Sequence, residues 1–314
     1  MHGKNATERL SADEAGIARA VAVLREGGNV AVPTETVYGL AARADDPQAV
    51  AAIFAAKGRP SFNPLIVHVA DMATAETLAD LDKRARLLAR AFWPGPLTLV
   101  LPVSNAAALA PAVTAGLDTV ALRCPAHPVM QQVLAGLGQP LAAPSANRSE
   151  TVSPTAADHV LATLDGRIDG IIDGGESARG LESTIVAIDP DGGWSMLRPG
   201  PITECEIAAV LGEAPQPDAG GIRAPGQLAR HYAPGKPLRL AAREAREGEF
   251  LLGFGNIAGD WSLSPSGDLA EAAARLYAGL HRAAAAKETK IAVAPIPGEG
   301  LGRAINDRLR RAAA

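Results

Sequence analysis

The sequence has very few cysteines, since Cys124 and Cys205 are the only two among its 314 residues. Two thiols cannot build a disulfide framework, and they cannot supply the ligand set of a structural zinc or an iron–sulfur cluster. Such sparse cysteine usage fits a reducing compartment. The sequence therefore predicts a cytoplasmic protein.

A large excess of positive charge is also missing. The sequence has 30 Lys and Arg against 34 Asp and Glu, a formal net charge of −4. Any contact with a nucleic acid would have to use a local basic patch, because the overall field is not attractive to phosphates. A polybasic, histone-like binder is excluded.

Long apolar runs are absent from the start of the sequence. Residues 1–20 contain six charged side chains and no apolar h-region, and no run is long enough to span a bilayer. We therefore expect neither a secretory signal peptide nor a membrane contact.

Several common catalytic signatures are absent as well. The sequence has no GxxxxGK[ST], HExxH, EF-hand or GxSxG motif, which argues against P-loop NTPases, zincins, calcium sensors and typical serine hydrolases. Residues 253–258 match GxGxxA after an expected strand, but Gly259 and the segment WSLSP follow where a helix should begin. Dinucleotide binding is therefore disfavoured there.

What is present is the composition of a folded soluble protein, with 47% apolar and 20% charged residues. The length suits two domains of about 150 residues each. Residues 212–237 hold five glycines and five prolines and show no sustained apolar period. We therefore predict a catalytic domain over 1–211, a linker over 212–237 and a small domain over 238–314.

Short apolar runs alternate with helical patterns, which predicts an α/β fold. The expected strands of the first domain are residues 30–32, 65–69, 97–101, 119–123, 168–172 and 183–188. The second domain shows the same alternation of strands and helices, with a strand at 250–253, a helix at 268–286, a strand at 291–294 and a final helix from 301. This predicts a sheet of mixed direction followed by a smaller, Rossmann-like layer.

Helix start and stop signals predict the two ends of a helix that carries Lys57. Asp46 offers an N-cap acceptor before Pro47, and Gly58 is a left-handed stop. Lys57 is therefore expected on the last turn of this helix.

Two further helix starts are indicated. Ser153 and Pro154 resemble a start signal before residues 155–164, and Thr203 with Glu206 forms a capping box before residues 207–211.

The loop that leaves the first of these helices carries Lys57, Arg59 and Asn63. Such a loop can clasp an anion. The alternative is that the two cations merely complement the negative end of the helix dipole, an effect worth about 0.3–1 kcal/mol. Lysine is scarce in this part of the chain, which weakly favours a specific role for the charge.

Two strands carry polar residues that could contact a ligand. In the strand 119–123, alternation puts Thr119 and Arg123 on one face, and the planar fork of Arg123 suits a carboxylate. The alternative is an ordinary salt bridge to an acidic side chain. His68 in the strand 65–69 is by itself more typical of a structural histidine than of a metal ligand.

The segment 142–147 consists of small residues after a short apolar strand, so a ligand could approach its backbone closely. Ser145 and Asn147 project short polar groups there, although a plain Ser or Asx turn has the same composition. Ser183 adds a hydroxyl on a strand, and Arg198 stands before a proline break.

Taken together, six stretches resemble the YrdC-like family in order and spacing. They are PTETVYGL at 33–40, KGR at 57–59, NPLIVH at 63–68, WPGPLT at 93–98, APSAN at 143–147 and EST at 182–184. The Gly/Pro-rich linker with APG at 224–226 and RHYAP at 230–234, followed by a small domain, is similar to the long, two-domain form of this family. The resemblance begins near residue 13 and covers nearly all of the chain after it.

This resemblance implies an enzyme that joins L-threonine, bicarbonate and ATP into threonylcarbamoyl-AMP and pyrophosphate, for the threonylcarbamoyladenosine modification of tRNA. By family analogy, threonine would be held by Thr36, His68, Arg123 and Ser183. ATP would be held by Arg59, Asn63, Thr119, Ala143, Ser145, Ser153, Arg198 and Tyr232. Lys57 and Arg59 would meet the phosphates, and Asn147 would support the Ser145 loop, so that the expected catalytic group is Lys57, Arg59, Ser145 and Asn147.

The implied reaction is an in-line displacement at the α-phosphorus, which needs positioning and charge neutralisation more than a protein nucleophile. Mg²⁺ is expected to arrive with the nucleotide and not in a protein cage, and no tightly bound organic cofactor is implied. The linker would act as a lid with Tyr232 over the nucleotide. Residues 227–229, QLA, depart from the family pattern, in which a methionine and a basic residue are more usual.

The implied partners are a downstream tRNA threonylcarbamoyl-transfer complex and a weak direct contact with tRNA. Two alternatives stay open. One is an RNA-binding module without adenylate chemistry, which the net charge disfavours. The other is a carbamoyltransferase like the hydrogenase-maturation proteins with a related domain, which would carry zinc-finger cysteines and an acylphosphatase module.

Overall fold

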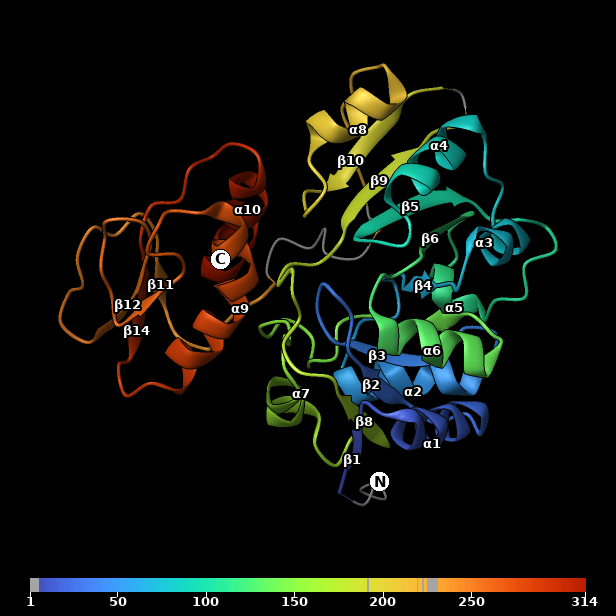
Figure 1. The fold of residues 1–314 in the computed structure, drawn as a ribbon, viewed down its shortest axis with the longest axis horizontal. Helices are drawn as coiled ribbons and strands as arrows, with labels where there is room; N and C mark the ends of the chain where they lie inside the picture. Colours follow the sequence, from blue (N-terminus) through green and yellow to red (C-terminus); the bar gives the residue numbers. More distant parts are fainter. Residues whose placement is uncertain (1–5, 191, 219, 222, 225–230) are drawn as a thin grey trace.

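The computed structural model describes residues 6–190, 192–218, 220–221, 223–224 and 231–314. The larger, N-terminal part is built on a ten-stranded sheet with the order β1-β8-β2-β3-β7-β4-β6-β5-β9-β10 (Figure 1). Its strands are β1 (Glu8–Ser11), β2 (Val30–Val32), β3 (Gly39–Arg43), β4 (Ile66–His68), β5 (Leu97–Pro102), β6 (Thr119–Arg123), β7 (Leu141–Ala142), β8 (Gly170–Asp173), β9 (Thr184–Ile188) and β10 (Trp194–Arg198).

The sheet is mixed in direction. β4 runs parallel to β6, whereas β5 is antiparallel to β6 and β7 is antiparallel to β4. The accompanying helices are α1 (Glu14–Arg25), α2 (Pro47–Lys57), α3 (Met72–Leu78), α4 (Lys83–Phe92), α5 (Pro111–Thr114), α6 (Pro128–Leu137), α7 (Ala157–Leu164) and α8 (Glu204–Leu211). The predicted mixed α/β fold is therefore confirmed.

The C-terminal part is a smaller, parallel α/β layer. Its four-stranded sheet has the order β11-β14-β12-β13, and the paired strands all run parallel. Its elements are β11 (Leu238–Arg239), β12 (Glu249–Gly253), β13 (Trp261–Ser262), α9 (Leu269–Ala285), β14 (Lys290–Val293) and α10 (Leu301–Ala313). Figure 1 shows that α9 and α10 lie between this sheet and the larger part.

The apolar core of the C-terminal part continues into the larger part. It consists mainly of residues on β12, β14, α9 and α10, but Val37, Val152 and Leu181 of the larger part belong to the same buried cluster. Burial of apolar surface stabilises the packed arrangement by about 25 cal/mol per Å². The two parts are thus joined by a packed interface.

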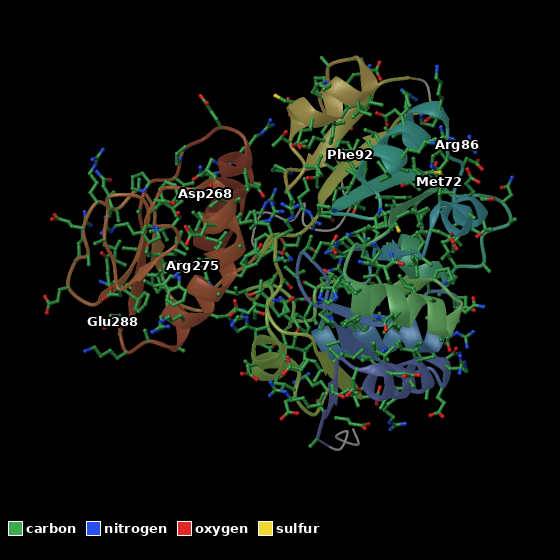
Figure 2. The ribbon with its side chains drawn as sticks, viewed as in Figure 1. Met72, Arg86, Phe92, Asp268, Arg275 and Glu288 are labelled. Carbon is green, nitrogen blue, oxygen red and sulfur yellow. The ribbon has the colours of Figure 1, made fainter. Side chains whose placement is uncertain are left out.

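Several local signals form as predicted. The side chain of Asp46 accepts from the N–H groups of Gln48 and Ala49 at the start of α2, and Gly58 ends the helix at φ 61°. Thr203 and Glu206 make a complete capping box at α8. Helix α9 begins within one residue of its expected start, and Asp268, labelled in Figure 2, caps it by accepting from the N–H of Glu271, a contact that was not predicted.

One predicted helix start is wrong. α7 begins at Ala157, and its cap residue Ala156 makes no side-chain hydrogen bond. The Ser153 hydroxyl donates to the buried carboxylate of Glu182 at 2.6 Å. This charge-assisted hydrogen bond is stronger than a neutral one and fixes the Ser153 hydroxyl inside the molecule, four residues before α7 begins.

After the GxGxxA match in the C-terminal part, the chain turns back on itself through paired Phe254 and Ile257 and then enters β13. The next helix begins only at Leu269. A pyrophosphate would therefore find no helix N-terminus at these glycines. Among the described residues, no helix has both the length and the apolar character needed to cross a membrane.

Candidate active site

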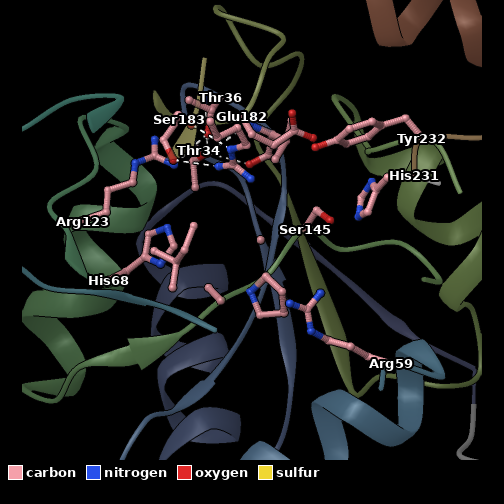
Figure 3. Close-up of a pocket in the computed structure, with 16 residues that line it drawn as sticks. Thr34, Thr36, Arg59, His68, Arg123, Ser145, Glu182, Ser183, His231 and Tyr232 are labelled. Carbon is pink, nitrogen blue, oxygen red and sulfur yellow. Dashed lines mark hydrogen bonds between the residues drawn. The ribbon is translucent and has the colours of Figure 1, made fainter. Parts of the chain in front are cut away.

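A pocket opens where loops and strand ends of the large sheet meet the end of the linker. Its lining residues are Thr34, Thr36, Val37, Gly39, Arg59, Ile66, His68, Arg123, Ala143, Pro144, Ser145, Glu182, Ser183, Arg198, His231 and Tyr232 (Figure 3). In that view, Arg123 and His68 lie at one end, whereas Arg59 and Tyr232 lie at the other, with Ser145 between them. The pocket therefore has two separate cationic ends.

The sheet register brings the first end together. Because β4 and β6 pair in parallel with His68 opposite Arg123, both side chains reach the same end of the pocket. Arg123 is buried and donates from Nη1 to Thr36 Oγ1 at 2.8 Å and from Nε to the Gly95 carbonyl at 3.2 Å. The pocket thus has a fixed guanidinium at this end.

The salt bridge considered as an alternative for Arg123 is present, because Nη2 lies 2.6 Å from Glu35 Oε1. Burial works to raise the pKa of Glu35, but the charge and hydrogen bond of Arg123 outweigh it and the pKa falls below its usual value. A guanidinium has five N–H donors, and Arg123 uses three of them on Glu35, Thr36 and Gly95. The ion pair is therefore compatible with a carboxylate ligand on the remaining two.

His68 is a neutral group in this environment. Burial first, and the nearby charge of Arg123 second, lower the pKa of His68 to about 3. Its Nδ1 atom is buried and has no hydrogen-bond partner in the described structure. A neutral imidazole next to Arg123 can hydrogen-bond a ligand without repelling an ammonium group.

Ser183 is fixed by two polar neighbours. Its hydroxyl lies 2.7 Å from Thr98 Oγ1, and Arg198 donates to the same hydroxyl at 3.1 Å and to the Ser183 carbonyl at 3.0 Å. Arg198 is itself buried and lines the pocket. The hydroxyl and the guanidinium are therefore held in one arrangement.

Arg59 supplies the cation at the opposite end. Its guanidinium donates to the carbonyls of Asn63 at 3.2 Å and of Pro64 at 2.8 Å, which closes the loop after α2 around it. Burial, followed by the charge of Arg198, lowers the pKa of Arg59 to about 10. Arg59 therefore stays charged at neutral pH.

Lys57 is placed differently from the sequence expectation. It is buried, it does not line the pocket, and its ammonium donates to the carbonyls of Ser145 and Asn147 at 2.5 Å each. Burial, then the charge of Arg59, lowers the pKa of Lys57 well below its usual value. Lys57 thus clamps the loop that presents Ser145 to the pocket.

Replacing Lys57 by methionine should lower the free energy of unfolding by about 2–4 kcal/mol, because two buried carbonyls would lose their partner. Denaturant unfolding measures this. Lys83→Met, at an exposed position in the first turn of α4, is the matched control and should leave stability unchanged. Equal stability of the two variants would contradict the clamp.

Four other predicted residues also lie outside the pocket lining. Asn147 supports the Ser145 loop as expected, because its Nδ2 donates to the carbonyls of Arg148 and Thr151 at 2.9 Å. Asn63 is buried and holds Arg59 through its carbonyl, while Thr119 lies half-buried at the start of β6. Ser153 reaches the pocket only through Glu182.

Nine of the fourteen predicted residues line the pocket. They are Thr36, Arg59, His68, Arg123, Ala143, Ser145, Ser183, Arg198 and Tyr232. Sequence reasoning missed seven lining residues, of which Thr34, Glu182 and His231 are polar, and each of these three lies within two positions of a residue that was predicted. Their nearness in the sequence to predicted site residues was the signal that could have pointed to them.

Tyr232 has an unusual backbone conformation. It adopts φ 65°, a region that bulky residues rarely occupy, and its side chain is buried in the pocket wall. The His231 N–H donates to the Arg311 carbonyl on α10, and the Ala233 N–H donates to the Glu150 carbonyl at 2.7 Å. Hydrogen bonds on both sides therefore hold this end of the linker between the two parts of the molecule.

Most of the remaining lid prediction lies outside the described residues. Residues 219, 222 and 225–230 are not described, and they include Pro225, Gly226 and the departure at 227–229. Within the described residues, no group of three or more His, Cys, Asp or Glu is arranged to hold a metal ion.

A mixed α/β sheet with buried arginines and hydroxyls converging on one pocket defines a binding site for small anionic substrates. The Sua5/YciO/YrdC family model, described as telomere recombination, matches residues 22–200, and the model of the threonylcarbamoyl-AMP synthase C-terminal domain matches residues 202–314. The chain therefore belongs to the Sua5/YciO/YrdC family, in its form with this C-terminal domain.

Relatives that match over nearly the full chain carry one enzyme name. The threonylcarbamoyl-AMP synthase of Bacillus subtilis is 42% identical, over 98% of this chain and 95% of its own. That of Pyrococcus abyssi is 40% identical over 98% and 96%. The crystal structure of P. abyssi Sua5 complexed with L-threonine has a TM-score of 0.87 and 37% identity, covering 98% of this chain and 97% of that one.

Proposed function

We infer that the chain is an ATP-dependent threonylcarbamoyl-AMP synthase that acts in the threonylcarbamoyladenosine modification of tRNA. The observation that carries the inference is one pocket with Arg123 and His68 at one end and Arg59 and Tyr232 at the other, with the buried Arg198 also in its lining. We place the amino acid at the first end and the nucleotide at the second. Full-length relatives with this enzyme name support the same activity.

Threonine would occupy the end formed by Thr36, His68, Arg123 and Ser183. The two unused N–H groups of Arg123 would bind its carboxylate, a charge-assisted contact worth about 1.5–3 kcal/mol. Neutral His68 would accept from or donate to the amino acid without adding a second positive charge.

ATP would occupy the end lined by Arg59, Ala143, Ser145, Arg198 and Tyr232. The two arginines would neutralise the triphosphate, and the small Ala143 side chain leaves main-chain groups open to the nucleotide. Asn63, Ser153 and Lys57 would act indirectly, because their contacts hold Arg59, Glu182 and the Ser145 loop. We keep Thr119 as a proposed nucleotide contact, although it does not line the pocket.

Between the two ends, the amine of threonine would form a C–N bond to the carbon of bicarbonate, and a water molecule would leave to give a carbamate. One carbamate oxygen then attacks the α-phosphorus, an O–P bond forms, and the bond to the β-phosphate oxygen breaks to release pyrophosphate. The chain's contribution is alignment of the two substrates and stabilisation of the charge that spreads over the phosphates. Arg59 and Arg198 are placed for that role.

The donor set fits a magnesium ion held mainly by the nucleotide. Glu182 is the one carboxylate that lines the pocket in the described structure, and it accepts from Ser153, Tyr277 and Arg308. Phosphate oxygens and water would fill most of the octahedral shell of Mg²⁺. The ion would supply further neutralisation of the triphosphate.

We propose the division into a catalytic domain over 1–211, a lid over 212–237 and a small domain over 238–314. Its support is the position of Tyr232, which lines the pocket from the end of the linker. The lid would limit hydrolysis of the mixed anhydride product. Transfer onto tRNA would fall to a separate downstream complex.

The purified protein should release pyrophosphate from ATP only when both threonine and bicarbonate are present. A coupled pyrophosphate assay measures this, with D-threonine as the matched control because it carries the same groups in mirror arrangement. Equal pyrophosphate release with and without L-threonine would contradict the proposed function. Salt-sensitive binding of tRNA with no pyrophosphate release would favour the RNA-binding alternative.

A further inference from the structure

Arg308 is an arginine of the C-terminal part that lies wholly inside the molecule. It belongs to α10, and none of its surface is exposed. Buried arginines need compensating partners, because removing a charge from water is costly. The groups that contact Arg308 therefore indicate its role.

Two of its partners lie in or beside the wall of the catalytic pocket, and the third is Asp307 of the same helix, which accepts from Nη1 at 2.7 Å. Arg308 Nε donates to Glu182 Oε2 at 2.8 Å, and Nη2 donates to the Pro199 carbonyl at 3.0 Å, directly after Arg198. Its guanidinium carbon lies 5.4 Å from the centre of the Tyr232 ring. Glu182, Arg198 and Tyr232 all line the pocket.

The network around Glu182 is saturated. Ser153 donates to Oε1 at 2.6 Å, and Tyr277 of α9 donates to Oε2 at 2.8 Å beside Arg308. Burial works to raise the pKa of Glu182, but Arg308 and then Arg198 outweigh it and lower the pKa to about 2. Without Arg308, this buried carboxylate would lose its main counter-charge.

We propose that Arg308 is a positioning residue of the synthase, fixing Tyr232 at the nucleotide end of the pocket together with Glu182 and the backbone next to Arg198 in its wall. This rests on the proposed function. The C-terminal part would then contribute to the reaction through the Arg308 side chain. Loss of its contacts would shift the residues of the pocket wall, and a shift of about 1 Å in a catalytic site can lower the rate about 100-fold.

The competing explanation is that Arg308 merely attaches the two parts of the molecule to each other. A second ion pair on the same helix separates the two explanations. Arg303 Nη1 lies 2.7 Å from Glu204 Oε2 on α8, so this pair also joins the two parts, but it is exposed and does not line the pocket. Arg303→Met breaks an attachment without touching the nucleotide end.

The test uses the full-length protein and its Arg308→Met, Arg308→Lys and Arg303→Met variants. Pyrophosphate assays give kcat and the KM for ATP, calorimetry gives the affinity for threonine, and thermal unfolding checks the fold. We expect Arg308→Met to lower kcat/KM for ATP by about 30-fold while threonine affinity changes by less than about threefold. Arg308→Lys should recover part of the loss, and Arg303→Met should keep kcat/KM within about twofold.

Wild-type nucleotide kinetics in Arg308→Met would overturn the proposal, and so would equal losses in Arg308→Met and Arg303→Met. If Arg308→Met does not fold, Arg308→Lys decides: an unchanged KM for ATP and an unchanged kcat in that variant would overturn it. Failure of the proposed function is distinguishable, because the wild-type protein itself would then release no threonine-dependent pyrophosphate.

Discussion

Replacing Arg123 by alanine should lower kcat/KM for threonine by about 500-fold, while the KM for ATP changes by less than about threefold. The reason is that the carboxylate of threonine would enter a buried site with no cation to meet it. Initial rates of pyrophosphate release, measured with one substrate varied at a time, separate the two effects. Equal increases in the KM for both substrates would argue against the carboxylate role.

The same substitution leaves Glu35 buried without its partner, and breaking one side of a buried ion pair costs about 3–5 kcal/mol of stability. Arg123→Lys is therefore measured beside it, because lysine keeps the positive charge next to Glu35 but loses the planar fork. We expect this variant to fold and to show a smaller loss that is still confined to threonine. Glu35→Gln tests the ion pair alone and should preserve most of the threonine affinity.

Replacing Arg59 by alanine should lower kcat/KM for ATP by about 1,000-fold, the range seen when an arginine that stabilises a transferring phosphoryl group is lost. Arg59 is charged at neutral pH, buried, and held by the Asn63 and Pro64 carbonyls. The affinity for threonine, read by calorimetry without nucleotide, should stay within about threefold of the wild-type value.

The matched control for Arg59 is Arg25, an arginine in the last turn of α1 that donates to the Gly136 carbonyl. If Arg59 only complemented the end of a helix, the two alanine variants would behave alike, with small losses of stability and normal kinetics. Normal ATP kinetics in Arg59→Ala would therefore remove Arg59 from the phosphate site.

Much of the secondary structure could be predicted because its signals are local. Asp46 and Gly58 bound α2, and Thr203 with Glu206 begins α8, through contacts within about four residues of the helix end. The strands β2 and β6 have their predicted bounds for the same reason, since short apolar runs form them. The one wrong helix start is at Ser153, whose hydroxyl is bound to a carboxylate distant in the chain, and the helix begins four residues later.

The candidate site was predictable wherever its residues form part of contiguous motifs. Thr36, Arg59, His68, Ser145 and Ser183 each stand in such a stretch, and each lines the pocket. The role of Lys57 was not predictable in this way, because its partners are carbonyl groups some 90 residues later in the chain. Every residue has a backbone carbonyl, so the residue types at these positions do not indicate that Lys57 binds there.

The sequence by itself determined the α/β class, the helix ends and the motifs that mark the family, because these depend on neighbouring residues. Only the tertiary structure decided that Arg123 is paired with Glu35 and that Arg308 meets Glu182. Arg308 and Glu182 are 126 positions apart and come from different parts of the molecule. A buried charge selects its partner by distance and by the loss of water around it, and both are set by packing rather than by chain order.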